Sequence, residues 1–167
     1  MRRRLARALF VLGLVATGQE HLVHAGPLPA DHDALAVITS RQTIIPDFSG
    51  VLLRDIFLKK VVLTSEGREY IPVNLPPMNP LRKAFNKNVI HMDIQQSELF
   101  WDKAYFAGTS PPYVLDSERA VLRFVAKEHG AIGYVRACFV TPEVKVLKLI
   151  PLAVPPSGYP LTACPSK

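Results

Sequence analysis

The sequence lacks the patterns by which metal sites, nucleotide sites and catalytic centres are usually recognised. Its 167 residues include only five histidines and two cysteines, and no histidine has a second ligand at the spacing that a metal site requires. No Gly-rich phosphate-binding loop occurs, and no ordered set of Cys, His and acidic residues suggests a nucleophile. We therefore expect a non-enzymatic protein that uses no metal and no cofactor.

Hydrophobic runs of membrane-spanning length are also absent. The apolar stretch from Ala8 to Ala16 has nine residues, fewer than the roughly 20 that a transmembrane helix needs. It follows arginines at positions 2–4 and 7 and precedes the tripeptide Val23-His24-Ala25. A positive segment, a short apolar segment and a small residue at the cleavage point are typical of a secretory signal peptide. We predict cleavage near Ala25 and a periplasmic or secreted mature protein without a transmembrane segment.

A strong excess of one charge is missing from the predicted mature chain. Hydrophobic residues make up 49% of the sequence and charged residues 20%, which is a globular composition. Cleavage after Ala25 removes four arginines and one glutamate and so lowers the formal net charge from +6 to +3. The remaining lysines and arginines are scattered along the sequence. This distribution argues against nucleic-acid binding and is compatible with the attraction of small anions.

Cysteine is scarce, but the two cysteines present, Cys138 and Cys164, suit an oxidising compartment. An even number of cysteines in an exported protein favours a disulfide. We predict a bridge between Cys138 and Cys164, with two unrelated buried thiols as the alternative. The bridge would pin the Pro-rich C-terminal segment to the strand that carries Cys138.

Apolar spacing and capping residues predict strands that alternate with helices. Strands are expected at residues 35–39, 131–135, 139–140 and 144–150, with shorter β-prone pieces within 61–73 and at 113–115. Helices are expected to begin after four N-cap residues, Ser49, Asn79, Asp93 and Ser117. This alternation indicates an α/β fold with a mixed sheet flanked by helices. The predicted layout is a signal peptide at 1–25, a flexible lead at 26–34, an α/β domain at 35–150 and a Pro-rich strap at 151–167.

A series of short motifs occurs in an informative order between Leu35 and Val135. The motifs are Arg54-Asp55-Ile56-Phe57-Leu58, Ile71-Pro72-Val73, Asn79-Pro80-Leu81-Arg82-Lys83-Ala84-Phe85, Phe100-Trp101, Phe106-Ala107-Gly108 and Gly130-Ala131-Ile132-Gly133-Tyr134-Val135. In this order they resemble the phosphate-binding branch of the type 2 periplasmic solute-binding proteins. The resemblance covers about one hundred residues and implies a single lobe of a fold in which two lobes enclose the ligand. A chain of this length is expected to lack the second lobe.

The resemblance implies an oxyanion site at the helix that starts at Asn79. The family holds phosphate at a helix start of the pattern Ser-Gly-Thr-Arg. Here Asn79, Pro80 and Leu81 replace the first three residues, and Arg82 matches the fourth. The N-terminus of a helix suits an anion, and an arginine adds a bidentate contact. We expect Asn79 and Arg82 to bind the ligand; the alternative is that Asn79 only caps the helix and Arg82 is solvated.

Two further candidate ligand residues, Ser40 and Arg41, follow the first predicted strand. In α/β sheets, ligands bind beyond the carboxyl ends of the strands. We therefore expect Ser40 and Arg41 to face the same crevice as Arg82. A solvated loop without a binding role is the alternative.

The sequence leaves two functions open. The first is a solute-binding-like module that recognises phosphate or a similar small anion and takes the other half of its cleft from a homodimer or a partner protein. The second is a ligand-free lobe that serves as an interaction module for an envelope sensor or transporter. Trp101, Tyr105 and Phe106 are assigned to the core because they lie on one predicted helix, so neither hypothesis uses them.

Overall fold

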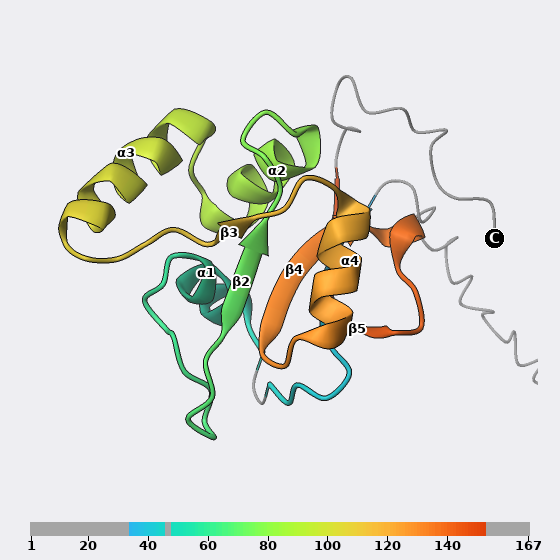
Figure 1. The fold of residues 1–167 in the computed structure, drawn as a ribbon. Helices are drawn as coiled ribbons and strands as arrows, with labels where there is room; N and C mark the ends of the chain where they lie inside the picture. The colour runs from blue at the N-terminus through green and yellow to red at the C-terminus, as the bar shows by residue number, and fades with distance from the viewer. Residues whose placement is uncertain (1–33, 46–47, 153–167) are drawn as a thin grey trace, which may run out of the picture.

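A mixed five-stranded sheet forms the centre of the computed structural model, which describes residues 34–45 and 48–152 (Figure 1). The strands are β1 (Ala34–Ser40), β2 (Ile71–Asn74), β3 (Tyr113–Val114), β4 (Ala131–Arg136) and β5 (Val144–Pro151). They lie in the order β3-β2-β4-β1-β5. The prediction of an α/β fold with a mixed sheet is confirmed.

Strand direction divides the sheet into two parts. β2 runs parallel to both β3 and β4, whereas β1 is antiparallel to β4 and to β5. The carboxyl ends of β2, β3 and β4 therefore meet at one end of the sheet. The carboxyl end of β1 lies at the other end, because Thr39 pairs with Ile132 near the start of β4.

In the described part of the chain, four α-helices surround the sheet and begin where their capping residues predict. They are α1 (Gly50–Phe57), α2 (Pro80–Phe85), α3 (Ile94–Phe106) and α4 (Glu118–Lys127). A side-chain oxygen of each N-cap accepts a hydrogen bond from a backbone N–H group; the N-caps are Ser49, Asn79, Asp93 and Ser117. Asp93 and Gln96 complete a capping box. Local sequence thus determines where each helix starts.

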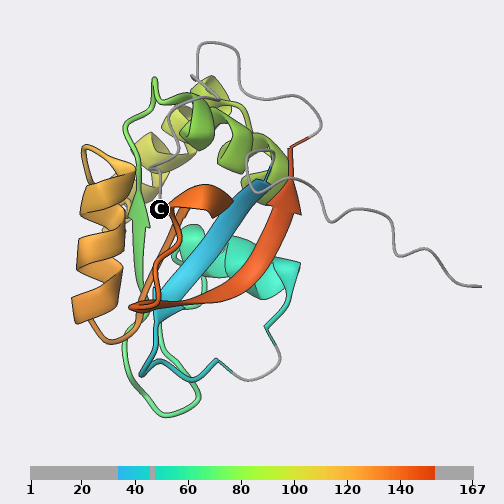
Figure 2. The ribbon, with the colours of Figure 1, turned by 90° about the vertical axis from the view of Figure 1, so that its right-hand side faces the viewer.

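Helices cover both faces of the sheet (Figure 2). α4 covers one face, where Val121 packs so closely on Gly133 of β4 that a Cβ atom at Gly133 would collide with it. On the opposite face, the rings of Tyr134 and Phe85 stack with their centroids 4.0 Å apart. Phe57 of α1 lies against Phe85, with a centroid separation of 4.6 Å. Adjacent residues of β4 thus anchor two different helical layers.

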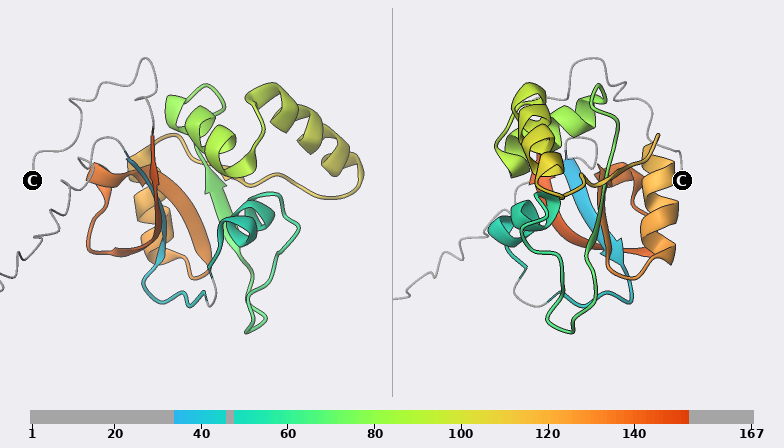
Figure 3. Two further views of the ribbon diagram at one scale, coloured as in Figure 1. Left: turned by 180° about the vertical axis from the view of Figure 1, so that it is seen from behind. Right: turned by 60° about the vertical axis from the view of Figure 1, so that its left-hand side comes forward.

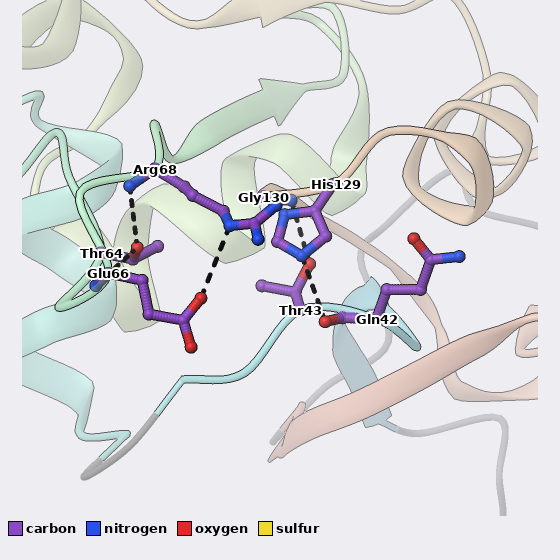
Figure 4. A network of polar contacts seen from close by, with 7 residues as sticks. All are labelled: Gln42, Thr43, Thr64, Glu66, Arg68, His129 and Gly130. Carbon is purple, nitrogen blue, oxygen red and sulfur yellow. Dashed lines mark hydrogen bonds and ion pairs between the residues drawn. The ribbon is translucent and has the colours of Figure 1, made fainter.

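The loop that enters β4 requires a glycine at position 130. Gly130 has a φ angle of +84°, and a Cβ atom there would overlap the carbonyl oxygen of Glu69. The Gly130 N–H donates to Thr43 Oγ1 (3.0 Å), and the Gly130 carbonyl accepts from Ile71 N (2.9 Å). Figure 4 shows the bond between Gly130 and Thr43, beside which His129 Nε2 donates to the Gln42 carbonyl oxygen. The glycines of the 130–135 motif therefore have packing roles.

The predicted strand at residues 139–140 is wrong. Ala137–Phe139 form a 3₁₀-helix directly after β4. The Arg136 guanidinium lies 4.4 Å from the centroid of the Phe139 ring. It also pairs with the buried carboxylate of Glu118 (Nε to Oε1, 3.0 Å), which accepts a further bond from the Arg136 backbone N–H (2.6 Å). These long-range contacts favour a turn, and an apolar run alone does not reveal them.

Helix α3 is more exposed than its sequence predicts. Trp101 is half-buried, whereas Tyr105 is 66% exposed and Phe106 is 90% exposed. The assignment of Tyr105 and Phe106 to the core is therefore wrong. Figure 3 shows α3 at the end of the molecule away from β5, where no other described element covers its outer side. Helical spacing identifies residues on one face, and it does not tell whether another element packs on that face.

Several predictions lie outside the described residues. These are the signal peptide at 1–25, the lead up to residue 33, the strap from residue 153 and the position of Cys164. Ala34, the last residue of the predicted lead, already belongs to β1. Cys138 lies in the 3₁₀-helix and is not a free thiol, and its pairing with Cys164 stays a prediction. Within residues 34–45 and 48–152, no helix is long and apolar enough to cross a bilayer.

Candidate anion-binding site

A groove of about 230 Å³ opens at the carboxyl ends of β2 and β3. The last residues of these strands, Asn74 and Val114, are partners in the sheet register and both line the groove. Ligands of α/β proteins commonly bind at this end of parallel strands. We call this space the Arg82 groove, defined by Asn74, Arg82, Ser97, Glu98, Trp101 and Asp102.

Arg82 of α2 is a buried cation without a counter-ion among the described residues. The residue is 8% exposed, and its Nε and Nη1 atoms have no hydrogen-bond partner among the described residues. None of the ion pairs in the described part of the chain includes it. Burial lowers the pKa of the Arg82 guanidinium, and Tyr134 acts on that pKa in the opposite direction. A buried charge is costly unless an opposite charge or hydrogen-bond acceptors compensate it.

A smaller cavity of about 10 Å³ shares Asn74, Arg82, Ser97 and Trp101 with the groove. This volume holds about one water molecule or one ligand oxygen. Asn86 also lines the cavity, and its buried Nδ2 atom has no hydrogen-bond partner among the described residues. The cavity is therefore lined by two side chains with N–H donors that the described residues leave unpaired, and such donors suit an oxygen acceptor.

An irregular helical turn places Asn86 at this cavity. α2 ends at Phe85, and Asn86–Ile90 form a π-helix. Asn86 is 1% exposed, whereas Asn88 of the same turn lies at the surface. The sequence predicts an ordinary helix here, so it does not single out Asn86. Turns of this type frequently occur at functional sites.

Hydrogen bonds between β2 and β4 fix the side of the site that the sheet forms. The Tyr134 O–H group donates to Asn74 Oδ1 (3.3 Å) and accepts from Leu75 N (3.3 Å). The Tyr134 ring is in turn fixed by its stack on Phe85. The Asn74 side chain at the groove is therefore positioned before any ligand arrives, and a preorganised polar group loses little entropy on binding.

Asn79 acts as a helix cap. Its Oδ1 atom accepts a hydrogen bond from Leu81 N at 2.8 Å, and Pro80 has no N–H group to offer. Asn79 is not among the residues that line the groove, whereas Arg82 is. The start of α2 thus keeps few free donors, and the candidate for contact with an anion at this point is the Arg82 side chain.

Ser40 and Arg41 lie at the opposite end of the sheet from Arg82. The expectation of one shared crevice is wrong because β1 runs antiparallel to β4, so that its carboxyl end points away from the groove. Ser40 Oγ accepts from Gln42 N (3.3 Å), and Arg41 Nη1 donates to the Pro142 carbonyl oxygen (2.9 Å). Both side chains therefore hold local loops together.

Helix α3 supplies a wall of the groove that the sequence analysis did not identify. Ser97 and Trp101 lie one turn apart on α3, and Glu98 and Asp102 form a second such pair beside them. Ser97 is buried and both carboxylates are exposed. The capping box at Asp93 and the four-residue spacing are the signals by which this wall could have been found. Within the described ranges, no three His, Cys, Asp or Glu side chains are arranged to hold a metal ion.

The fold is shared with substrate-binding proteins of phosphate ABC transporters. A Clostridium perfringens protein described as a phosphate ABC transporter substrate-binding protein, solved with bound phosphate, matches with a TM-score of 0.57 and 19% identity, over 71% of this chain and 46% of that one. An ABC-type phosphate transport receptor from Vibrio cholerae matches with a TM-score of 0.52 and 13% identity, over 68% of this chain and 45% of that one. PstS from Borrelia burgdorferi matches with a TM-score of 0.53 and 14% identity, over 77% of this chain and 49% of that one.

These structures confirm the predicted resemblance at the level of the fold. This chain spans just under half the length of each of them, as one lobe would. Neither a family model nor a curated protein matches the chain. Because a shared fold does not carry a shared ligand, the function has to be argued from the Arg82 groove.

Proposed function

We propose that this protein is an exported, non-catalytic binding protein that holds a small oxyanion such as phosphate at Arg82. The observation that carries the proposal is the buried guanidinium, whose Nε and Nη1 atoms have no partner among the described residues. An oxyanion supplies both the missing charge and the missing acceptors. The bound phosphate in the C. perfringens structure supports the choice of phosphate as the first ligand to test.

The neighbouring donors fit the same ligand. Asn86 Nδ2 lacks a partner beside Arg82, and the Ser97 hydroxyl lines both the cavity and the groove. One ligand oxygen in the small cavity and the rest of the anion in the groove would use all three side chains. A single lobe offers one wall of a cleft, so the proposal includes a homodimer or an envelope protein as the source of the other wall.

A second function is favoured by the outer side of α3. Leu99 is 61% exposed, Tyr105 66% and Phe106 90%, and exposed apolar clusters of this kind mark interaction surfaces. In this alternative the lobe is an interaction module for an envelope sensor or transporter and needs no ligand. Sedimentation of the wild-type chain and of Phe106→Ser tests the homodimer form, which the substitution is expected to dissociate.

The proposed function is tested by calorimetric titration of the full chain with inorganic phosphate at low salt. The wild-type protein should bind phosphate, and Arg82→Met should lose binding at least about tenfold because the charge–anion hydrogen bonds disappear. Lys83→Met is the matched control: it removes an adjacent but exposed positive charge and should change the affinity by less than about threefold. An equal loss in both variants would indicate only a general electrostatic attraction.

A further inference from the structure

The Arg82 groove carries charges of both signs. Glu98 and Asp102 line it from α3 on adjacent turns, and both are exposed. Neither takes part in any of the ion pairs within the described residues. Arg82, more than nine-tenths buried with two unpartnered nitrogen atoms, lines the same groove. A buried cation and two carboxylates, none of them in an ion pair with another described residue, thus line one groove.

These carboxylates disfavour a ligand that carries only negative charge. Like charges in a partly desolvated groove repel each other more strongly than they do in bulk water. A simple polyanion is therefore attracted by Arg82 and repelled by Glu98 and Asp102. A ligand with a cationic group at its other end is attracted at both places, and Trp101, which lines the same groove, is an aromatic residue of the kind that attracts cations.

The dimensions of the groove limit the size of such a ligand. Its volume of about 230 Å³ lies below the roughly 300–1,000 Å³ of pockets for drug-sized molecules. Pro77 on one side and Pro111 and Pro112 on the other give the groove stiff edges. A short molecule with a few carbon atoms between its two charged ends is the class that suits this space.

We infer that the natural ligand is a small zwitterion, with an oxyanion head at Arg82 and a protonated amine at Glu98 and Asp102. This inference rests on the proposed function, since it keeps the oxyanion site and adds a second recognition point. Arg82 supplies the affinity for the head, and the two carboxylates make the site specific for molecules that also carry an amine.

The test compares 2-aminoethylphosphonate with ethylphosphonate, which has the same oxyanion and carbon chain without the amine. Titrated into the full chain under identical conditions, 2-aminoethylphosphonate should bind roughly three- to tenfold more tightly. Equal affinity, or tighter binding of ethylphosphonate, would overturn the inference and leave the oxyanion site intact. If the wild-type protein binds neither compound, the inference is overturned, and the titration with inorganic phosphate decides separately whether the oxyanion site exists.

A double variant separates the carboxylate contribution from a general effect. In Glu98→Gln with Asp102→Asn, the preference for 2-aminoethylphosphonate should disappear, while the affinity for ethylphosphonate stays the same or rises. The matched control Glu128→Gln removes an exposed negative charge at the end of α4 and should keep the preference. A preference that survives the double variant would show that the amine is recognised elsewhere or not at all.

Discussion

Arg82 is both charged and buried, and this combination is energetically unfavourable. The guanidinium loses its hydration in the groove, its pKa is lowered by this burial, and no carboxylate among the described residues compensates it. Residues with this combination cluster at binding sites, because stability there is given up for function. The conflict leads to a prediction in which stability and binding change in opposite directions.

Arg82→Met should leave the melting temperature unchanged or raise it, while it removes phosphate binding. Methionine fills a similar volume without a charge, and replacing a buried charge with an apolar group is often neutral or stabilising. For a chain of this size, each kcal/mol gained raises the melting temperature by about 2–4 °C. Thermal unfolding followed by circular dichroism, with and without phosphate, measures both effects. A large drop in melting temperature would identify Arg82 as a structural residue instead.

Asn86→Asp should stabilise the protein and weaken phosphate binding about tenfold or more. The new carboxylate shares the small cavity with the Arg82 guanidinium and so acts as an internal counter-ion that repels the ligand. Asn88→Asp makes the same charge change at an exposed position of the same π-helix. It should leave the phosphate affinity unchanged and lower the stability slightly, because the hydrogen bond from Asn88 Nδ2 to the Ala84 carbonyl oxygen (2.9 Å) is lost. Thermal unfolding and calorimetric titration of the two variants test this, and unchanged phosphate affinity in Asn86→Asp would contradict the role of the cavity.

Among the elements, β4 and the loop before it make the contacts that connect the two ends of the sheet. Gly130 links this loop to the segment after β1 and to β2 through hydrogen bonds with Thr43 and Ile71. Gly133 and Tyr134 then contact opposite helical layers. The groove depends on this arrangement because the Tyr134 hydroxyl positions Asn74. Substitutions far from the ligand can therefore reach the site through β4.

Gly130→Ala should destabilise the protein by about 3 kcal/mol or more, since the added Cβ meets the Glu69 carbonyl oxygen as well as an unfavourable φ angle. Gly108→Ala is the matched control. Gly108 has the same φ of +84°, but nothing lies within 4 Å of its Cβ position, so the expected cost is about 1 kcal/mol. Urea denaturation gives both values. Equal losses would show that backbone conformation alone explains the glycine at position 130.

For the whole molecule, the position of the groove beside α3 bears on both candidate functions. The groove lies at the end of the sheet where β2 and β3 finish, and α3 extends beyond that end with apolar side chains exposed. An adjoining protein surface in this position would close the groove and cover α3 at the same time. The two candidate functions therefore share one geometry and differ in whether an anion is enclosed.

Unreduced full chain should contain a single intramolecular disulfide between Cys138 and Cys164. Cys138 is not a free thiol, and a bridge that closes a loop of this length contributes about 3 kcal/mol. Alkylation without prior reduction, followed by mass spectrometry of proteolytic peptides, detects the linked pair. Cys164→Ser should lower the stability by a similar amount, with Ser157→Ala as a control in the same segment. Alkylation of both thiols in the unreduced protein would contradict the bridge.

Features that depend on neighbouring residues could be predicted before the structure was known. The caps at Ser49, Asn79, Asp93 and Ser117 were predictable because a side-chain oxygen and the N–H group it accepts from lie within three residues of each other. The order of the elements and the resemblance of the motif at Gly130–Val135 were sufficient to predict the α/β fold. Arg82 was singled out because it matches one position of the family pattern, and its role as a ligand residue stays a prediction.

The surroundings of Arg82 depend on tertiary contacts. The antiparallel direction of β1 separates Ser40 and Arg41 from the groove, and the π-helix turns Asn86 inward. The side of α3 that meets the groove, and the exposure of Phe106, depend on which elements pack beside that helix. Strand direction, helix register and burial arise from contacts between residues far apart in the chain. They therefore cannot be predicted from periodicity and local motifs.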